Sequence, residues 1–226
     1  MNILKEKLLI KGTAKLVTGL HIGDSKDTVD IGGVDSPIIR RKDNNQPYIP
    51  GSSLKGKMRC LLQLADGEAD ERYAPNSRVC ELFGALPAKG DRDSGISSRI
   101  IVRDAFMTSS SAAELAANSM TDLPYSEVKV ENRIDRIKGA AEHPRQIERV
   151  PAGAAFALEF VINVMVDERE HTDPAKVAAK RDKLLDTFNK GIHLLRHDYL
   201  GGNGSRGYGQ LEIELEAPVT VYPVQQ

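Results

Sequence analysis

The sequence has no apolar run that approaches the roughly 20 residues needed to cross a membrane as a helix. Its first residues, MNILKEKLLIKG, mix lysines with apolar residues and lack a small-residue cleavage site, so we expect no signal peptide. The only two cysteines, Cys60 and Cys80, are far apart and form no C-x-x-C motif. These absences favour a reduced cytoplasmic protein with no membrane partner, and they argue against a zinc site.

The sequence also lacks an excess of charge of either sign. Its 226 residues include 31 Lys and Arg against 32 Asp and Glu, a net charge of −1, and its pI is about 6.5. A free-standing nucleic-acid-binding domain usually has a pI above about 9. Any contact with nucleic acid must therefore come from a local patch or be strengthened by many copies of the chain. The length suits one large domain or a core domain with insertions.

Several catalytic and nucleotide-binding motifs are absent as well. There is no G-x-S-x-G motif, and neither cysteine has an evident histidine partner. The glycine-rich stretch HDYLGGNGSRGYGQL, residues 197–211, lacks the G-K-[ST] end of a P-loop. This stretch follows an expected helix and precedes an expected strand, so it is not a dinucleotide-binding fingerprint either. There is also no internal repeat and no low-complexity segment.

The first half of the chain alternates between patterned and irregular segments. Residues 3–18 alternate loosely and carry β-branched residues, which predicts a strand. Residues 19–49 are rich in Gly and Asp and predict a long loop with a short extended piece at 36–40. A helix is expected next, with Ser52 or Ser53 as its cap. Its apolar face has helical spacing and consists of Leu54, Met58, Leu61, Leu62 and Ala65.

The second half carries the clearer patterns. VCELFG at 79–84 predicts a short helix within an irregular stretch, and SSSAAELAAN at 109–118 predicts another. Strands are predicted at 98–107, at 154–166 and in the closing segment 210–223. Between the last two, a long helix is expected to start at Thr172 or Asp173, with Pro174 in its first turn, and to end at Gly201 or Gly202.

This order of elements predicts the fold class. Strand, helix, strands, helix, strand is the order of a ferredoxin-like, RRM-type antiparallel sheet with two helices, in the α+β class. The stretches 19–49 and 108–150 are long for connections in a compact domain, and connections of that length are usually functional or disordered.

Two stretches have a composition that suits phosphate groups. The glycines of 197–211 let the backbone approach a ligand closely, successive N–H groups can form an anion-binding nest, and Arg206 adds a charge. PGSSLKGKMR at 50–59 offers a helix N-terminus, two hydroxyls and three cations. The alternatives are a plain helix-to-strand connection and an ordinary capped helix with a solvated basic face.

Three other features each allow a structural and a functional interpretation. ENRIDRIKGAAEHPRQIERV at 131–150 interleaves both charge signs, which indicates either a self-paired surface or cations that grip a nucleic-acid backbone. His21 lies between glycines and has no evident partner. Asp35, in IGGVDSPIIR, is either a turn residue or a carboxylate for metal-assisted chemistry on a phosphate, since Asp-Ser-Pro forms good turns.

Taken together, these motifs resemble one family. In order they are TGLHIG (18–23), GVDSPIIR (33–40), PYIPGSSLKGKMR (47–59), RDAF (103–106), EVKVENRIDR (127–136), PRQIER (144–149) and DYLGGNGSRGYG (198–209). The same order occurs in the repeated backbone subunit of the type III-A CRISPR interference (Csm) complex, a member of the RAMP superfamily. The resemblance covers about residues 3–215.

The resemblance implies a domain organisation. The whole chain, 1–226, would form a single RAMP domain with an RRM-like palm built from about 3–65, 98–107 and 154–222. A thumb hairpin would come from about 121–150, and a variable insertion from about 66–97.

The resemblance also implies a function. The subunit would bind guide RNA (crRNA) in several copies stacked head-to-tail, together with other subunits of the complex. It would cut complementary target RNA by 2′-OH attack that depends on Mg²⁺ or another divalent cation. Asp35 would be the catalytic and metal-binding residue. The candidate RNA-binding residues are His21, Ser52, Ser53, Lys55, Lys57, Arg59, Arg133, Arg136, Arg145, Gly202, Gly204, Arg206 and Gly207.

Three alternatives remain open from the sequence. The chain could be a guide-binding scaffold in which Asp35 only forms a turn. It could be a guide-processing endonuclease with a histidine-centred site, which would require a partner for His21. It could also be the type III-B counterpart subunit, although the residues of the motifs PGSSLKGKMR and PRQIER favour type III-A.

Overall fold

The computed structural model describes residues 2–24, 34–68, 77–87, 89–91 and 94–223, with the side chain of Arg133 also left out. The central sheet is antiparallel and has the strand order β3-β7-β1-β8. Its strands are β1 (Asn2–Leu16), β3 (Ile100–Val102), β7 (Ala155–Asp167) and β8 (Leu211–Leu215), and β9 (Val219–Tyr222) also pairs with β1. The mixed α+β class expected from the sequence is therefore confirmed.

Two long antiparallel strands form the centre of this sheet. β1 and β7 pair from Asn2↔Asp167 to Lys15↔Ala155. Alternate side chains of β7 are buried on one face, at Phe156, Leu158, Phe160, Ile162, Val164 and Val166. The period of two is what a strand with one covered face requires.

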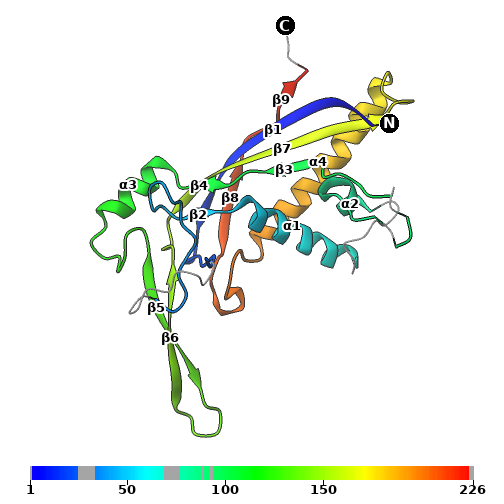
Figure 1. Cartoon of the computed structure of the whole chain (residues 1–226). Coiled ribbons are helices and arrows are strands. Elements are labelled where there is room, and N and C mark those ends of the chain that lie inside the picture. The colour runs from blue at the N-terminus through cyan, green and yellow to red at the C-terminus, as the bar shows by residue number, and fades with distance from the viewer. Residues whose placement is uncertain (1, 25–33, 69–76, 88, 92–93, 224–226) are drawn as a thin grey trace.

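Helices cover the buried face. α4 (Pro174–Arg196) lies along the sheet against β7 and β8, and α1 (Gly51–Asp66) and the short α2 (Arg78–Phe83) pack against α4 (Figure 1). The rings of Phe160 and Phe188 meet edge-on in this layer, with centroids 5.0 Å apart. Ala65, expected on the apolar face of α1, is instead exposed.

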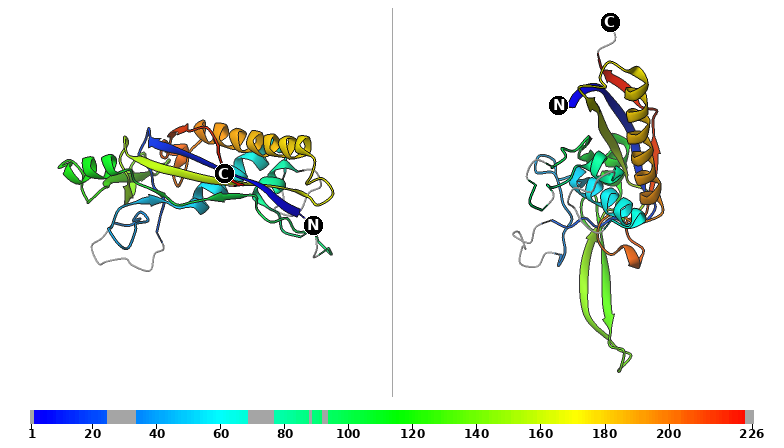
Figure 2. Two further views of the ribbon diagram at one scale, coloured as in Figure 1. Left: turned by 90° about the horizontal axis from the view of Figure 1, so that it is seen from above. Right: turned by 90° about the vertical axis from the view of Figure 1, so that its right-hand side faces the viewer.

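The remaining elements lie around the start of β7. β2 (Tyr48–Ile49) pairs with β4 (Ala105–Phe106), and α3 (Ser109–Ala117) follows β4. β5 (Glu127–Ile134) and β6 (Ala141–Arg149) form a two-stranded hairpin that projects away from the sheet (Figures 1 and 2). None of the helices in the described segments is long and apolar enough to cross a membrane.

Two predicted strands are each divided in the structure. The expected strand 98–107 is divided into β3, which pairs with β7, and β4, which pairs with β2. Asp104 lies between them, and its carboxylate accepts the Gly51 N–H (2.8 Å). The expected strand 210–223 is β8 and β9, separated by a segment containing Pro218, which has no N–H to donate to a ladder.

Two helix-end predictions are wrong. Neither Ser52 nor Ser53 caps α1, which begins at Gly51 and uses Asp104 from a distant segment. α4 ends at Arg196 rather than at the glycines, because the chain leaves the helix early to bury Leu200 and to bring Asp198 to Lys57. The start of α4 is as expected, since the Asp173 side chain accepts the N–H groups of Ala175 and Lys176.

We expect Phe188→Ala to lower the free energy of unfolding by about 3–5 kcal/mol, because it leaves a cavity in place of a fully buried ring. Leu64→Ala, on the exposed side of α1 at 73% exposure, should change it by less than about 0.5 kcal/mol. Urea unfolding followed by circular dichroism measures both. Similar losses in the two variants would show that the α4 layer is not the core.

Candidate nucleic-acid interface

The loop that carries Asp35 runs across the base of the β5–β6 hairpin. Asp35 is exposed, and its Oδ2 accepts the backbone N–H of Gln146 on β6 (2.8 Å). The next residue, Ser36, bridges to Ile147, and its carbonyl accepts the Glu148 N–H (3.1 Å). The carboxylate is therefore held at a defined position while remaining accessible to a ligand.

A buried carboxylate fastens this loop to the hairpin. Glu148 is 3% exposed, and its Oε2 accepts the N–H of Ile38 (2.8 Å). Its Oε1 accepts from the guanidinium of Arg40 and the hydroxyl of Ser126, both at 2.5 Å. A buried charge is stable only when it is paired and hydrogen-bonded. These partners meet that condition and join the loop, the hairpin base and residue 126.

His21 has the partner that the sequence did not reveal. Its Nδ1 lies 2.6 Å from the carbonyl oxygen of Glu148, which can only accept, so Nδ1 carries a proton. In the neutral ring Nε2 is then the acceptor. The His21 carbonyl accepts the N–H of Gly202 (2.8 Å). His21 therefore connects the hairpin to the glycine-rich loop.

Lys57 fixes the glycine-rich loop from the side of α1. Its ammonium lies 2.9 Å from Asp198 Oδ1 and 3.6 Å from the ring centroid of Tyr199. Burial alone would raise the pKa of Asp198, but the hydrogen bonds from Lys57 and the Tyr199 N–H lower it below its usual value. The Tyr199 ring in turn occupies the space beside Gly204, where a Cβ would lie 1.9 Å from a ring atom.

The other end of the loop is fastened to the hairpin. The Tyr208 ring is buried, and the charged ends of Lys129 and Arg149 lie 4.6 and 5.0 Å from its centroid. Burial and the neighbouring Glu131 carboxylate raise the pKa of Tyr208 to about 12. Arg206 also donates to Glu131 (2.9 Å). The positive φ of Gly207 (+86°), which L residues rarely adopt, allows the turn between Arg206 and Tyr208.

The segments around His21 and Ser36, the β5–β6 hairpin and the glycine-rich loop together line a cleft of about 530 Å³. Its lining residues are His21, Ser36, Glu131, Asn132, His143, Arg145, Ile147, Gly202, Asn203 and Arg206. The structure thus brings together four of the predicted RNA-binding residues, His21, Arg145, Gly202 and Arg206, beside the loop of Asp35. Guanidinium and imidazole groups in one cleft are suited to phosphate oxygens and base edges.

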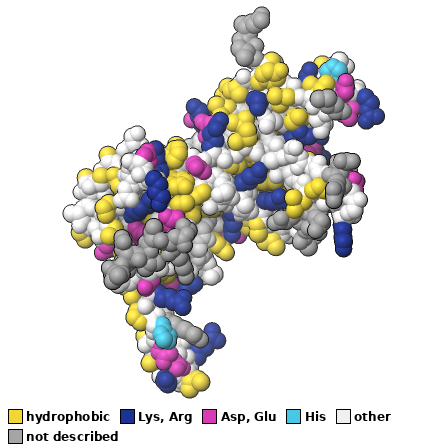
Figure 3. All heavy atoms as spheres, viewed as in Figure 1, with side chains coloured by type: hydrophobic (Ala, Val, Ile, Leu, Met, Phe, Trp, Pro, Cys, Tyr) yellow, Lys and Arg dark blue, Asp and Glu magenta, His cyan; other side chains and the backbone are white. Residues whose placement is uncertain are grey.

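The charges of the hairpin divide into paired and unpaired ones. Lys129, Lys138 and Arg149 form ion pairs with acids of the hairpin itself. Among the described ion pairs, none involves Arg136 or Arg145, and both side chains are exposed. Figure 3 shows this mixture of basic and acidic side chains along the hairpin. The interpretation as a self-paired surface therefore holds for Lys129, Lys138 and Arg149, while contact of Arg136 and Arg145 with a nucleic-acid backbone stays a prediction.

The other predicted RNA-binding residues whose side chains the structure describes are not among those that line the cleft. Arg136 lines a separate hollow of about 920 Å³ at the hairpin tip, and Arg133 belongs to β5. On α1, Lys55 donates to the Ser98 hydroxyl (2.8 Å), and burial lowers its pKa. Arg59 is half-buried on the same helix. The helix start is also less open than expected, because the Gly51 N–H already binds Asp104.

The described acids near Asp35 do not by themselves form a complete set of metal ligands. In the described segments, no three His, Cys, Asp or Glu side chains gather as a metal site. Asp24 lies 3.9 Å from the ammonium of Lys42, while Asp27, Asp30 and the glycines at 32–33 lie outside the described residues. A single accessible carboxylate still fits Mg²⁺, which keeps several waters and takes its other ligands from substrate phosphates.

Sequence reasoning missed the residues that hold the site together. Glu148, Tyr199 and Tyr208 all lie inside quoted motifs, yet none was a candidate. Glu148 stands between Ile147 and Arg149 in PRQIER, and strand alternation would not have identified it, because Ile147 and Glu148 are consecutive and both buried. Nothing local in DYLGGNGSRGYG indicates that one tyrosine packs on Gly204 and the other under the hairpin.

Comparison with known sequences gives consistent matches along the whole chain. The profile of the RAMP superfamily matches residues 13–212. A Streptococcus thermophilus protein named CRISPR system Cms endoribonuclease Csm3 is 40% identical over 218 residues, covering 96% of this chain and 91% of the relative. A Methanocaldococcus jannaschii protein with the same name is 38% identical over 220 residues, covering 93% of this chain and 79% of the relative.

Comparison with solved structures agrees. The chain is similar to a chain in the crystal structure of the Csm3–Csm4 subcomplex of the type III-A CRISPR-Cas interference complex. The TM-score is 0.55 at 28% identity, covering 97% of this chain and 82% of that chain.

We expect Gly204→Ala to lower the melting temperature, because the new methyl would overlap the Tyr199 ring and overpacking costs about 1–3 kcal/mol. Gly56→Ala is the matched control. Gly56 lies in α1, and nothing lies within 4 Å of the position that an added methyl would take, so alanine should leave stability equal or raise it. Calorimetry that found both variants unchanged would contradict the packing of Tyr199 on the loop.

Glu148→Gln should cost about 3 kcal/mol of stability, since it leaves the Arg40 guanidinium without its carboxylate partner. It should also speed hydrogen exchange at the Ile38 amide, whose acceptor is weakened. Glu142→Gln, which removes an exposed partner of Lys138 at 3.6 Å, should have little effect. Urea unfolding and amide exchange would reject the anchoring role if the two variants behaved alike.

Proposed function

The chain belongs to the RAMP superfamily, and we propose that it is the repeated backbone subunit of a type III-A CRISPR effector complex. In this function it binds guide RNA and acts as an endoribonuclease on target RNA that is paired with the guide. The observation that carries the proposal is the position of Asp35. Its accessible carboxylate is fixed beside a cleft lined by Arg145, Arg206 and His21, in a chain 36–40% identical to proteins named endoribonucleases.

The fold supports this role. We interpret the order β3-β7-β1-β8, with α1 and α4 on one face, as a ferredoxin-like palm, because the two middle strands would then be the first and third of the motif. The β5–β6 hairpin within 121–150 would be the thumb, and 66–97 the variable insertion.

The cleft supplies contacts suited to an RNA backbone. Arg145 and Arg206 are exposed cations that line the cleft, and the glycines of 201–209 let a strand approach the backbone closely. Lys57 supports the cleft indirectly, because it holds Asp198 and Tyr199 of the glycine-rich loop in place. Because contacts of this kind are electrostatic, guide affinity should fall with salt.

The hairpin tip presents a different surface. Ile137 is 96% exposed and Ile134 is 65% exposed, on either side of Arg136. Apolar side chains inserted between base steps unstack them, while a neighbouring cation contacts phosphate. In the proposed complex the tip enters the guide–target duplex and displaces a target nucleotide from the stack.

The cleavage step then follows from geometry at the displaced nucleotide. Its 2′-oxygen attacks the adjacent phosphorus, the bond from phosphorus to the 5′-oxygen breaks, and the products are a 2′,3′-cyclic phosphate and a 5′-hydroxyl. One carboxylate oxygen of Asp35 faces the reacting phosphate and orients it. The other oxygen, Oδ2, accepts the backbone N–H of Gln146. A divalent cation bound there would neutralise phosphate charge and make the 2′-hydroxyl easier to deprotonate.

Stacking explains how a nearly neutral chain binds a polyanion. In the proposed complex, identical subunits along one guide form a head-to-tail, heterologous assembly that also includes other subunits of the complex. Each copy contributes a local set of unpaired cations, and the contributions add along the RNA.

One observation favours a second candidate function. The hydrogen bond from Gln146 to Asp35 is also what a purely structural tether would make. In that case the chain is a guide-binding scaffold, and Asp35 only shapes the loop.

We expect Asp35→Ala, in the assembled complex, to abolish metal-dependent cutting of matched target RNA, because no cluster of acids among the described residues replaces the lost ligand. Guide and target binding should stay within about twofold, because binding is spread over many phosphate contacts and base pairs. Asp35→Asn should fail nearly as badly, since a neutral amide is a weak Mg²⁺ ligand.

Asp43→Asn is the control, because it removes an exposed acid eight positions along that pairs locally with Arg41. Labelled RNA, with and without EDTA, reports the cutting and the end groups. Full cleavage by Asp35→Ala would support the scaffold function, and 3′-hydroxyl products would indicate attack by water instead.

A further inference from the structure

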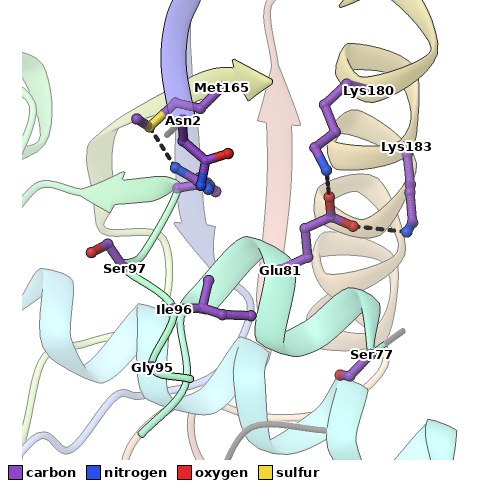
Figure 4. Close-up of a pocket in the computed structure, with 10 residues that line it drawn as sticks. Asn2, Ser77, Glu81, Gly95, Ile96, Ser97, Met165, Lys180 and Lys183 are labelled. Carbon is purple, nitrogen blue, oxygen red and sulfur yellow. Dashed lines mark hydrogen bonds and ion pairs between the residues drawn. The ribbon is translucent and has the colours of Figure 1, made fainter. Parts of the chain in front are cut away.

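A second cavity lies at the opposite end of the central sheet from the hairpin. It has a volume of about 530 Å³ and is formed where β1 begins, β7 ends and α2 faces α4 (Figure 4). Met165 lies in the wall of this cavity. It is ten residues further along β7 than Ala155, which begins the strand at the end nearer the hairpin. At about 3.3 Å per residue this separates the two sites by roughly 30 Å.

A buried arginine in this cavity has no carboxylate partner among the described residues. Arg99 is 7% exposed, and its Nη1 donates to the sulfur of Met165. A thioether is a weak, neutral acceptor and does not balance the charge. The Nε atom is buried without any hydrogen bond. Burial lowers the pKa of the guanidinium, and the more distant Glu81 only partly offsets this.

The facing wall has its own charges already paired. Glu81 on α2 accepts from Lys180 and from Lys183, the latter at 2.8 Å. Figure 4 shows both lysines reaching from α4 to this carboxylate. With Arg99 included, three cations surround one acid, so the cavity has a net positive charge. Ser97 and Asn2 add neutral hydrogen-bonding groups to the lining.

A buried guanidinium with no anion is costly, because burying a charge is tolerated mainly when it is paired. The planar fork of its donors matches the two oxygens of a carboxylate or phosphate. We propose that the cavity around Arg99 is a binding site for a single oxyanion group of the carboxylate or phosphate type. The group is either a free anion or an acidic side chain of a second copy of the chain.

An RNA backbone fits this cavity less well. Glu81 lies inside it, and Asp167 is the strand partner of Asn2 at its edge, so a continuous polyanion would meet two acids. The cavity is also far from the RNA cleft. The inference is therefore independent of RNA cleavage, and it is tested on the RNA-free chain.

Inorganic phosphate is the probe, titrated into the full chain by calorimetry, with sodium chloride at matched ionic strength as the reference. We expect saturable binding of one phosphate per chain. Arg99→Met should weaken it by about tenfold or more, since the charge-assisted contacts are lost. Arg103→Met is the control. Arg103 is a neighbouring cation that pairs with Glu159 outside the cavity, so this variant should bind as the wild type does.

A second variant keeps the test decisive if Arg99→Met does not fold. Ser97→Glu places a carboxylate in the cavity wall, so it should abolish phosphate binding and raise the melting temperature. Absence of saturable phosphate binding by the wild type, or equal binding by all variants, would overturn the proposal.

Sedimentation separates the two sources of the group. Self-association that phosphate reverses and Arg99→Met abolishes identifies a side chain of a second copy. A monomer that binds phosphate identifies a free anion.

Discussion

The pairing of one buried carboxylate with its donors determines where the candidate chemistry takes place. Glu148 lies in β6, yet its oxygens are satisfied by Arg40, Ser126 and the Ile38 N–H. Its main-chain carbonyl orients His21, and its main-chain N–H binds Ser36. An unpaired carboxylate at 3% exposure would be unstable, so these segments must converge wherever Glu148 is buried. The Asp35 loop, the cleft and the hairpin base thus share one determinant.

A division of charges follows from this arrangement. Cations that build the interface are already engaged: Arg40 with Glu148, Lys57 with Asp198, and Arg149 with Glu127. Within the described part of the chain, cations left exposed without an ion pair, such as Arg136 and Arg145, are available to a ligand. A net charge near zero therefore conceals two populations of basic residues, one paired within the fold and one exposed without an ion pair, and composition alone cannot separate them.

The sequence predicted those parts of the fold that depend on local periodicity. The strand at 154–166, the long helix beginning at Asp173 and the short helices at 79–84 and 109–118 all match the structure to within a few residues. The errors arose where a distant residue decides the outcome. At the start of α1, the Gly51 N–H is bound by Asp104 and not by a serine. After α4, Asp198 pairs with Lys57, so the helix ends before the glycines. In the candidate site, motifs predicted roles for Asp35 and the glycine-rich loop, and those roles stay predictions. The supporting residues, Glu148, Tyr199 and Tyr208, depend on tertiary packing that no local pattern records.

The hairpin has a further consequence for how this protein can diverge. An isolated two-stranded hairpin is marginally stable in water, so β5 and β6 depend on contacts at their base with the Asp35 loop and Tyr208. The tip, around Ile137, contributes little to folding, because its side chains are exposed. Substitutions at the tip change the free energy of unfolding little, and they alter the surface that would contact a ligand. Selection can therefore retune recognition at the tip independently of the scaffold, whereas a change at the base would alter both at once.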